Sequence, residues 1–172
     1  MKQHVARASI KINARPEKVW DALTNPELVR RYMLGTTVDS NWTAGAPITW
    51  TGELRGRQYE DRGKVLRAER CRLLEYTHYS GMQGTPDSPE NHHTVKIELA
   101  DEGKDTKVTL VQEGNPTEEA RRHSEDNWRE MLDGLRQVVE QEEQDVGDDR
   151  ERHREPSRDR ERMEQDKDRK RY

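Results

Sequence analysis

The stretch Ile12–Met33, INARPEKVWDALTNPELVRRYM, decides the fold, because it contains an amphipathic helix that stops and restarts at once. Trp20 and Leu23 share the apolar face of its first half. Pro26 then removes a backbone donor and disfavours a continuous helix. The same site is a start signal, since Asn25 suits an N-cap and Pro26 suits the first helical position. We therefore predict two helices, over residues 16–24 and from residue 26 onward.

The segments around this stretch have the alternation of β-strands. Residues 8–14 precede it, with Ile10 and Ile12 on one face, which indicates a half-buried strand. After Gly35, short segments separated by turn residues predict an antiparallel meander. The expected strands cover residues 36–39, 47–51, 53–60, 64–69, 72–79, 94–99 and 106–113. The expected turns include residues 44–46, 62–63 and 101–105, and residues 81–91 form a long loop.

The last expected element is one long helix with a single apolar stripe. Its members recur at helical spacing: Trp128, Met131, Leu132, Leu135, Val138 and Val139. Burying a large aliphatic side chain is worth about 1.5–3 kcal/mol, so the stripe must lie on an apolar surface. The concave face of the sheet is the surface that the chain offers. The order of elements predicts an α+β architecture.

Composition divides the chain into a domain and an appendage. Charged residues make up 38% of the 172 residues and hydrophobic ones 29%, with no Phe. From Gln141 onward, 22 of 32 residues are charged (10 Lys or Arg and 12 Asp or Glu). Such a segment buries too little apolar surface to fold. We expect a folded domain over residues 1–140 and a charged, disordered tail over residues 141–172, although charge-paired helix on either side of Pro156 is an alternative for the tail.

The same inventory limits the location and the partners. The net charge of −4 argues against a nucleic-acid partner. The N-terminal residues have no apolar segment typical of a secretion signal, and no run is long enough to span a bilayer. Cys71 is the only cysteine, which excludes an internal disulfide and suits a reducing compartment. We expect a cytoplasmic monomer.

No constellation of catalytic or metal-binding residues stands out, so we assign no catalytic residue, metal or cofactor. The histidines are dispersed, and neighbouring His92 and His93 would point to opposite faces of a strand. Known phosphate-binding, dinucleotide and nucleophile motifs are absent.

His78 shares the expected concave face with Leu74 and Tyr76. There it could bind a polar ligand group or act as a base, or it could be a strand-end histidine bonded to a neighbour.

The aromatic residues leave a similar choice open. We expect Trp20 to pack between a helix and the sheet. Trp50, Tyr76 and Trp128 could line a pocket for a flat apolar ligand or form ordinary core. Without Phe, methionines must supply part of the bulky interior, which favours an adaptable cavity. The alternating charged residues 53, 55 and 57 are expected to form a solvated face.

Six segments in this order resemble a known family. They are Ile12–Met33, GAPITWTGELRG (Gly45–Gly56), GKVLRAERCRLLEYTHY (Gly63–Tyr79), the D-x-P-E loop at Asp87–Glu90, TKVTLVQEG (Thr106–Gly114) and NWREMLDGLRQVVE (Asn127–Glu140). The chain from about residue 10 to residue 140 resembles the helix-grip, START-like or SRPBCC superfamily. Within it, the chain is most similar to bacterial proteins named after the C-terminal domain of the activator of heat-shock protein 90 ATPase.

The resemblance implies a curved antiparallel sheet wrapped around a long C-terminal helix, with two short helices after the first strand. It also implies a hydrophobic cavity between sheet and helix. A Trp is frequent in the family near position 78, so His78 departs from the pattern. The candidate cavity residues are Tyr32, Met33, Trp50, Leu74, Tyr76, His78, Val95, Ile97, Trp128, Met131, Leu132 and Leu135.

Three functions follow from the resemblance. The leading hypothesis is a non-enzymatic domain that binds a small hydrophobic molecule, lipid-like or similar to an aromatic polyketide. The second is a co-chaperone or protein-interaction module with a role in the stress response. The third is a cyclase or lyase acting in the cavity, which would need His78 together with Tyr76 or a carboxylate near the ligand.

Overall fold

The computed structural model describes residues 4–81 and 84–154, with the backbone alone for residues 146–154. The contacts of the chain divide it into two units, Met1–Glu140 and Gln141–Tyr172. The first unit contains the sheet and the short helices, and it carries the candidate site.

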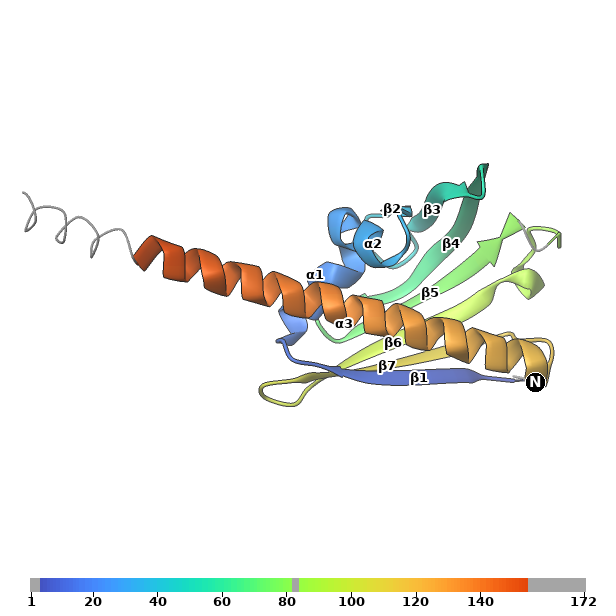
Figure 1. Ribbon diagram of the computed structural model, residues 1–172. Coiled ribbons are helices and arrows are strands. Elements are labelled where there is room, and N and C mark those ends of the chain that lie inside the picture. The colour runs from blue at the N-terminus through green and yellow to red at the C-terminus, as the bar shows by residue number, and fades with distance from the viewer. Residues whose placement is uncertain (1–3, 82–83, 155–172) are drawn as a thin grey trace, which may run out of the picture. The chain divides into compact units, whose positions relative to one another are not determined.

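The first unit is the predicted α+β helix-grip fold (Figure 1). Its seven strands form one antiparallel sheet in the order β1-β7-β6-β5-β4-β3-β2, and helix α3 crosses the concave face of this sheet. In chain order the elements are β1 (Ala6–Ile12), α1 (Pro16–Thr24), α2 (Pro26–Tyr32), β2 (Thr37–Asp39), β3 (Pro47–Leu54), β4 (Arg57–Glu69), β5 (Leu73–Ser80), the 3-10 turn η2 (Pro89–Asn91), β6 (His93–Asp101), β7 (Thr106–Glu113) and α3 (Glu118–Arg154).

The predicted restart between the first two helices is confirmed. Pro16 and Pro26 occupy the first turns of α1 and α2. Asn25 is extended and caps α2, because its side-chain oxygen accepts a hydrogen bond from the backbone N–H of Glu27 at 3.1 Å. Two further bonds hold the corner. The Tyr32 hydroxyl donates to the backbone oxygen of Ala22 at 2.6 Å, and Trp42 Nε1 donates to that of Thr24 at 3.1 Å.

Helix α3 packs through the stripe that the sequence predicts. Leu132 and Leu135 are fully buried, and they belong to the same core cluster as residues of the sheet. The helix is also anchored to β1 and to the residue that follows it. Glu125 accepts a hydrogen bond from the backbone N–H of Arg7 at 3.1 Å, and Glu140 accepts one from that of Asn13 at 3.0 Å. These two carboxylates satisfy backbone donors beside an edge strand.

The strand boundaries of the central hairpin correct the prediction. The sequence suggested one strand over residues 53–60 and a turn at residues 62–63. Instead the β3–β4 turn lies at Arg55 and Gly56, both with positive φ (52° and 79°), and β4 continues past Gly63 without a break. Two consecutive residues with positive φ are typical of a tight hairpin turn whose twist matches that of the strands.

Gly63 is explained by a close approach rather than by a turn. A Cβ atom added there would lie 1.8 Å from the backbone oxygen of Thr77 on β5 and 3.2 Å from the ring of Trp50 on β3. The residue is therefore glycine because neighbouring groups occupy the space of a side chain. Just beyond it, the β4–β5 register shifts between Val65 and Arg67, a bulge that increases local twist.

Helix α3 continues beyond Val139, the last residue of its apolar stripe. Disorder was expected from Gln141, but in the second unit the helix continues to Arg154. Glutamate, glutamine and arginine are good helix formers, and Gln141 donates a side-chain hydrogen bond to Asp145 one turn later at 3.1 Å. The expectation for residues 155–172 lies outside the described residues.

The cap at Asn25 gives the first prediction. Replacing Asn25 with Ala removes the acceptor for the Glu27 N–H and should lower the free energy of unfolding by about 1 kcal/mol. Urea-induced unfolding followed by circular dichroism measures the change. Asn25→Asp keeps an acceptor oxygen and is the control. Equal stabilities of the Ala and Asp variants would show that the cap contributes nothing.

Gly63 gives the second prediction. Gly63→Ala places a methyl group against the β5 backbone, so β4 and β5 must separate, at a cost of about 2 kcal/mol or more. Gly81→Ala is the matched control, since a Cβ atom at Gly81 would meet nothing within 4 Å and its φ is not positive. Its change in unfolding free energy should stay within about 0.5 kcal/mol. A Gly63→Ala variant as stable as the native protein contradicts the close approach.

Candidate functional site: a cleft between helices α2 and α3 and the β3–β4 hairpin

An open cleft of about 460 Å³ lies among α2, the β3–β4 hairpin, the end of β5 and α3. Its apolar lining comes from Tyr32 and Met33 of the α2 corner, Leu54 at the hairpin tip and Met131 of α3. Leu34 stands at the rim, 93% exposed and with a φ of 51°. The flexible methionine side chains can adapt this wall to different shapes.

Gly134 sets how closely α3 approaches α2 beside the cleft. A Cβ atom added at Gly134 would lie 3.2 Å from the Cβ of Tyr32. The α3 backbone therefore comes close to the backbone of Tyr32, whose hydroxyl is fixed by its bond to Ala22. Burial raises the pKa of the Tyr32 phenol, and the nearby Tyr76 phenol raises it further. The hydroxyl stays neutral and serves as a fixed donor.

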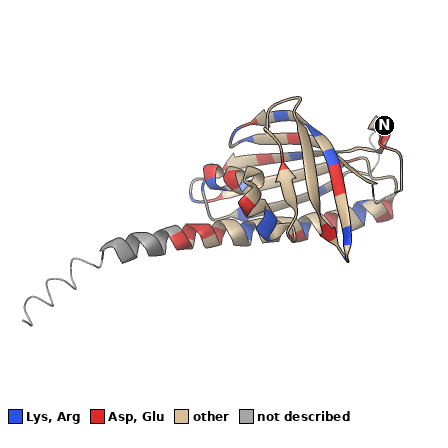
Figure 2. Cartoon of the chain, turned by 90° about the horizontal axis from the view of Figure 1, so that it is seen from above, with Lys and Arg blue, Asp and Glu red and all other residues tan. Residues whose placement is uncertain are grey.

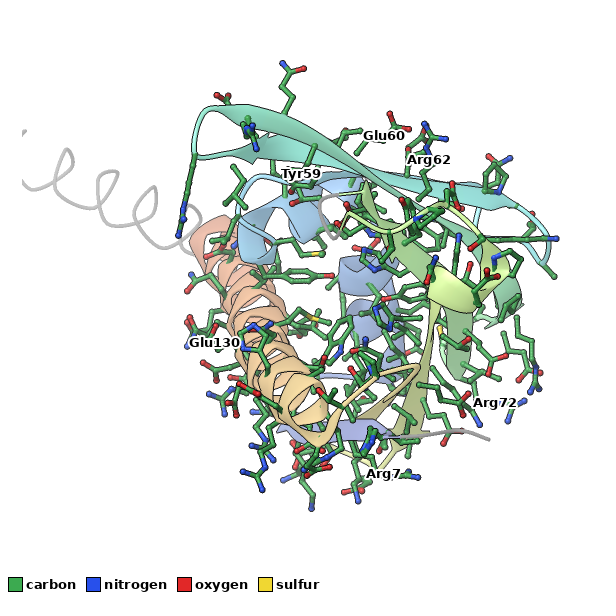
Figure 3. The ribbon with its side chains drawn as sticks, turned by 90° about the vertical axis from the view of Figure 1, so that its right-hand side faces the viewer. Arg7, Tyr59, Glu60, Arg62, Arg72 and Glu130 are labelled. Carbon is green, nitrogen blue, oxygen red and sulfur yellow. The ribbon has the colours of Figure 1, made fainter. Side chains whose placement is uncertain are left out.

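The opposite wall of the cleft is polar and comes mainly from β4. Tyr59 and Asp61 alternate with Glu60 and Arg62, so the two pairs face opposite sides of the strand. Figure 3 shows Tyr59 on the inner side of the hairpin and Glu60 and Arg62 on its outer side. The Tyr59 and Thr36 hydroxyls share a hydrogen bond. The other polar lining residues are Glu53, Ser80, Asn127 and Glu130.

Asp61 is paired with His78 across the sheet. His78 Nε2 on β5 lies 2.9 Å from Asp61 Oδ2 on β4, and the two side chains are 29% and 18% exposed. The Trp50 ring of β3 meets the His78 ring edge-on, with 5.0 Å between the centroids. Gly63 on β4 leaves room for the Trp50 ring, since a Cβ atom there would lie 3.2 Å from it. Asp61 Oδ1 is buried and has no hydrogen-bond partner among the described residues.

The neighbouring histidines on β6 have different surroundings. His93 stands opposite His78 in the β5–β6 pairing. Burial lowers the pKa of His93, and the proximity of His78 lowers it further. His92 instead bonds Asp87 at 2.6 Å and stacks on Tyr79. Among the residues with described side chains, no three potential metal ligands come together.

A second space, of about 40 Å³, lies behind the cleft and is lined mainly by Trp50, Leu74, Tyr76, Ile97 and Trp128, with Tyr32, Met33 and Met131 shared between the two. Such a void holds at most a little water and no organic ligand. The Trp50 and Tyr76 rings close it from the sheet side, with 5.5 Å between centroids.

The structure distributes the sequence candidates over three places. Tyr32, Met33 and Met131 line the cleft. Trp50, Leu74, Tyr76, Ile97 and Trp128 border only the small void, and His78 lies next to it against Trp50 and Asp61. Val95, Leu132 and Leu135 are buried in the core, with exposed fractions of 1%, 0% and 0%.

Sequence reasoning missed most of the polar lining. Asp61 and Tyr59 were not considered, and Glu53 was assigned to a solvated face. A usable signal existed, because Tyr59, Asp61, Gly63 and Val65 alternate along one strand. The misplaced turn at residues 62–63 broke that alternation. The pairing of Asp61 with His78 is a contact between strands, which a single sequence does not reveal.

The charges elsewhere on the fold are mixed. In Figure 2, basic and acidic residues are interspersed along the strands of the sheet and do not gather in one patch of a single sign. Several are paired locally, such as Arg62 with Glu60 at 3.4 Å and Lys96 with Glu98 at 2.8 Å. In the part of the chain that the structure describes, no helix has the length and hydrophobicity of a membrane span.

Comparisons with solved structures support the fold. The chain is 45% identical to ChR145 from Cytophaga hutchinsonii, covering 83% of this chain and 97% of that one, with a TM-score of 0.74. DynU16, a protein encoded in the dynemicin biosynthetic locus, is 16% identical over 80% of this chain and 48% of its own, with a TM-score of 0.67. The Aha1 dimer from Colwellia psychrerythraea is 18% identical over 78% and 95%, with a TM-score of 0.61.

A search of curated proteins found no match. The family model described as "Activator of Hsp90 ATPase homolog 1-like protein" matches residues 13–140, the span that contains α1, α2, the strands from β2 to β7 and the packed part of α3. The chain therefore belongs to the Activator of Hsp90 ATPase homolog 1-like family.

Proposed function

We propose that residues 1–140 form a non-catalytic domain that binds a small, mainly apolar molecule in the cleft between α2, α3 and the β3–β4 hairpin. The observation that carries the proposal is the cleft itself. Its volume of about 460 Å³ lies within the usual range of ligand sites, roughly 300–1,000 Å³, and its wall combines apolar side chains with a few polar groups.

The proposed position differs from the cavity expected between sheet and helix. The space found there, beside Trp50 and Tyr76, has a volume of about 40 Å³ and is too small for an organic ligand. The open cleft is large enough for a ligand, and the residues at its rim, Leu34 and Leu54, are exposed. DynU16, encoded in the dynemicin biosynthetic locus, has the same fold and supports ligand binding in general.

We also propose a cytoplasmic location, which the free Cys71 supports.

A fluorescent neutral probe tests this function. Phenylnaphthylamine, which fluoresces more strongly in apolar surroundings, should bind the full chain with a saturable increase in emission. Asn127→Trp projects a large ring into the cleft from an exposed position of α3 and should weaken binding about tenfold or more. The steric reason is direct, since the ring takes up ligand volume.

Gln137→Trp is the matched control, because it makes the same amide-to-indole change at another exposed position of α3 outside the cleft. Its affinity for the probe should equal that of the native chain. Absence of saturable binding, or an equal loss in both variants, would exclude the cleft as the binding site.

A second candidate function, protein interaction, is favoured by two exposed leucines beside the cleft. Leu34 is 93% and Leu54 is 47% exposed, and both line its rim. Exposed apolar groups that occur together often mark an interaction site. The Aha1 protein from Colwellia psychrerythraea, described as a dimer, has a related fold. We propose an ATP-dependent chaperone of the heat-shock protein 90 class as the alternative partner.

An ATPase assay of a bacterial chaperone of that class decides this alternative. The full chain should raise the rate of ATP hydrolysis, and the double variant Leu34→Ser, Leu54→Ser should abolish the effect without loss of folding, since both side chains are exposed. Leu66→Ser, a third exposed leucine on β4, is the control. An unchanged ATPase rate with the native chain argues against a chaperone partner.

A further inference from the structure

The cleft has an uneven distribution of charge. Its titratable lining includes three carboxylates, from Glu53 on β3, Asp61 on β4 and Glu130 on α3. No Lys or Arg occurs among the described residues of the lining. Carboxylates gathered around one concave surface add to a negative potential inside it. The cleft therefore attracts cations and repels anions.

Asp61 differs from the other two carboxylates, since its side chain is mostly buried and only one of its two oxygens has a hydrogen-bond partner in the part of the chain that the structure describes. Oδ2 is paired with His78 Nε2 at 2.9 Å. Oδ1 is buried and has no hydrogen-bond partner among the described residues. Buried polar atoms of folded proteins are nearly always hydrogen-bonded, so an exception calls for an explanation. A donor group on a bound molecule would complete the bonding of this carboxylate.

The position of Asp61 is supported from both neighbouring strands. His78 on β5 contacts it directly, and Trp50 on β3 packs edge-on against His78. Asp61 lines the cleft and its side chain is 18% exposed, but Oδ1 itself is buried, so a ligand donor reaches this oxygen only when the carboxylate turns about its Cβ–Cγ bond. That torsion has broad energy wells. Met131, on the facing helix, is flexible enough to move aside.

We infer that the cleft selects molecules with a positively charged amine next to an apolar body, and that Asp61 binds the amine while Met33 and Met131 contact the body. This inference rests on the proposed ligand-binding function. An ammonium group supplies donors for Oδ1 and balances the carboxylates, and hydrogen bonds between ions are stronger than neutral ones. A hydroxyl supplies only the donor, and a carboxylate is repelled.

Three probes with the same naphthyl body and similar size test the selection in the native chain. Naphthylethylamine is a cation at neutral pH, naphthylethanol is neutral and naphthylacetate is an anion. Affinities come from displacement of phenylnaphthylamine or from calorimetry. The amine should bind about tenfold more tightly than the alcohol, as expected for a charge-assisted bond, and the alcohol more tightly than the anion. Equal affinities for amine and alcohol overturn the inference.

Asp61→Asn tests the assigned residue, because it keeps the shape and removes the charge. The preference for amine over alcohol should disappear, while the affinity for the alcohol stays within about twofold. Glu60→Gln is the matched control. It makes the same change of charge one residue away, on the outer side of β4 (Figure 3), and should keep the full preference. A preference retained in Asp61→Asn excludes Asp61 as the amine-binding residue.

A second variant covers the case in which Asp61→Asn does not fold. Glu53 and Glu130 are exposed, so Glu53→Gln with Glu130→Gln disturbs no buried group. Its preference for the amine should fall to an intermediate value, and an unchanged preference contradicts the role of the acidic lining.

The experiments distinguish the charge selection from the proposed ligand-binding function. Binding of alcohol and amine with equal strength overturns the charge selection alone, whereas failure of every probe, phenylnaphthylamine included, overturns both.

Discussion

The contact between α3 and the concave face of the sheet is the constraint on which the rest of the first unit depends. Its apolar part is the stripe around Leu132 and Leu135, and its polar part is the pair of bonds to Glu125 and Glu140 from backbone donors in β1 and just after it. The spacing of the two acceptors along α3 matches the spacing of these two donors. Fifteen residues of helix span about 22 Å, and the six residues from Arg7 to Asn13 span about 20 Å of extended chain. The helix must therefore run alongside β1, in one register.

The position of α3 determines where the fold has free space. Near β1 and β7 the helix lies on the core, whereas toward α2 the β3–β4 hairpin bends away from it (Figure 1). Gly63 and the bulge after Val65 permit this bend, because one removes a side chain at a close approach and the other increases twist. The cleft is thus a consequence of a twisted sheet meeting a straight helix, with α2 closing the corner between them.

Local signals were sufficient for most of the fold. Asn25 and Pro26 specified the helix restart, the α3 stripe followed helical spacing, and the expected strand at residues 106–113 coincides with β7. The site was harder, because its parts come from α2, β3, β4, β5 and α3. Asp61 and His78 are 17 residues apart in sequence, and only the β4–β5 register brings them together. Gly63 misled the prediction, since a glycine needed for a close approach looks the same in sequence as a glycine in a turn.

The aromatic side chains explain why the space lies at the mouth rather than inside. In a chain without Phe, every aromatic side chain is a Trp or Tyr and carries a polar group that needs a partner when buried. Trp128 donates to Gln112, Trp42 to the Thr24 backbone, and Tyr32 to that of Ala22. Each bond fixes a ring in one orientation, so opening an interior cavity would break hydrogen bonds as well as packing. At the mouth the lining also includes Met33 and Met131, whose unbranched side chains can move. The cleft therefore lies where the chain has flexible side chains, next to the Asp61 carboxylate, one oxygen of which has no hydrogen-bond partner among the described residues.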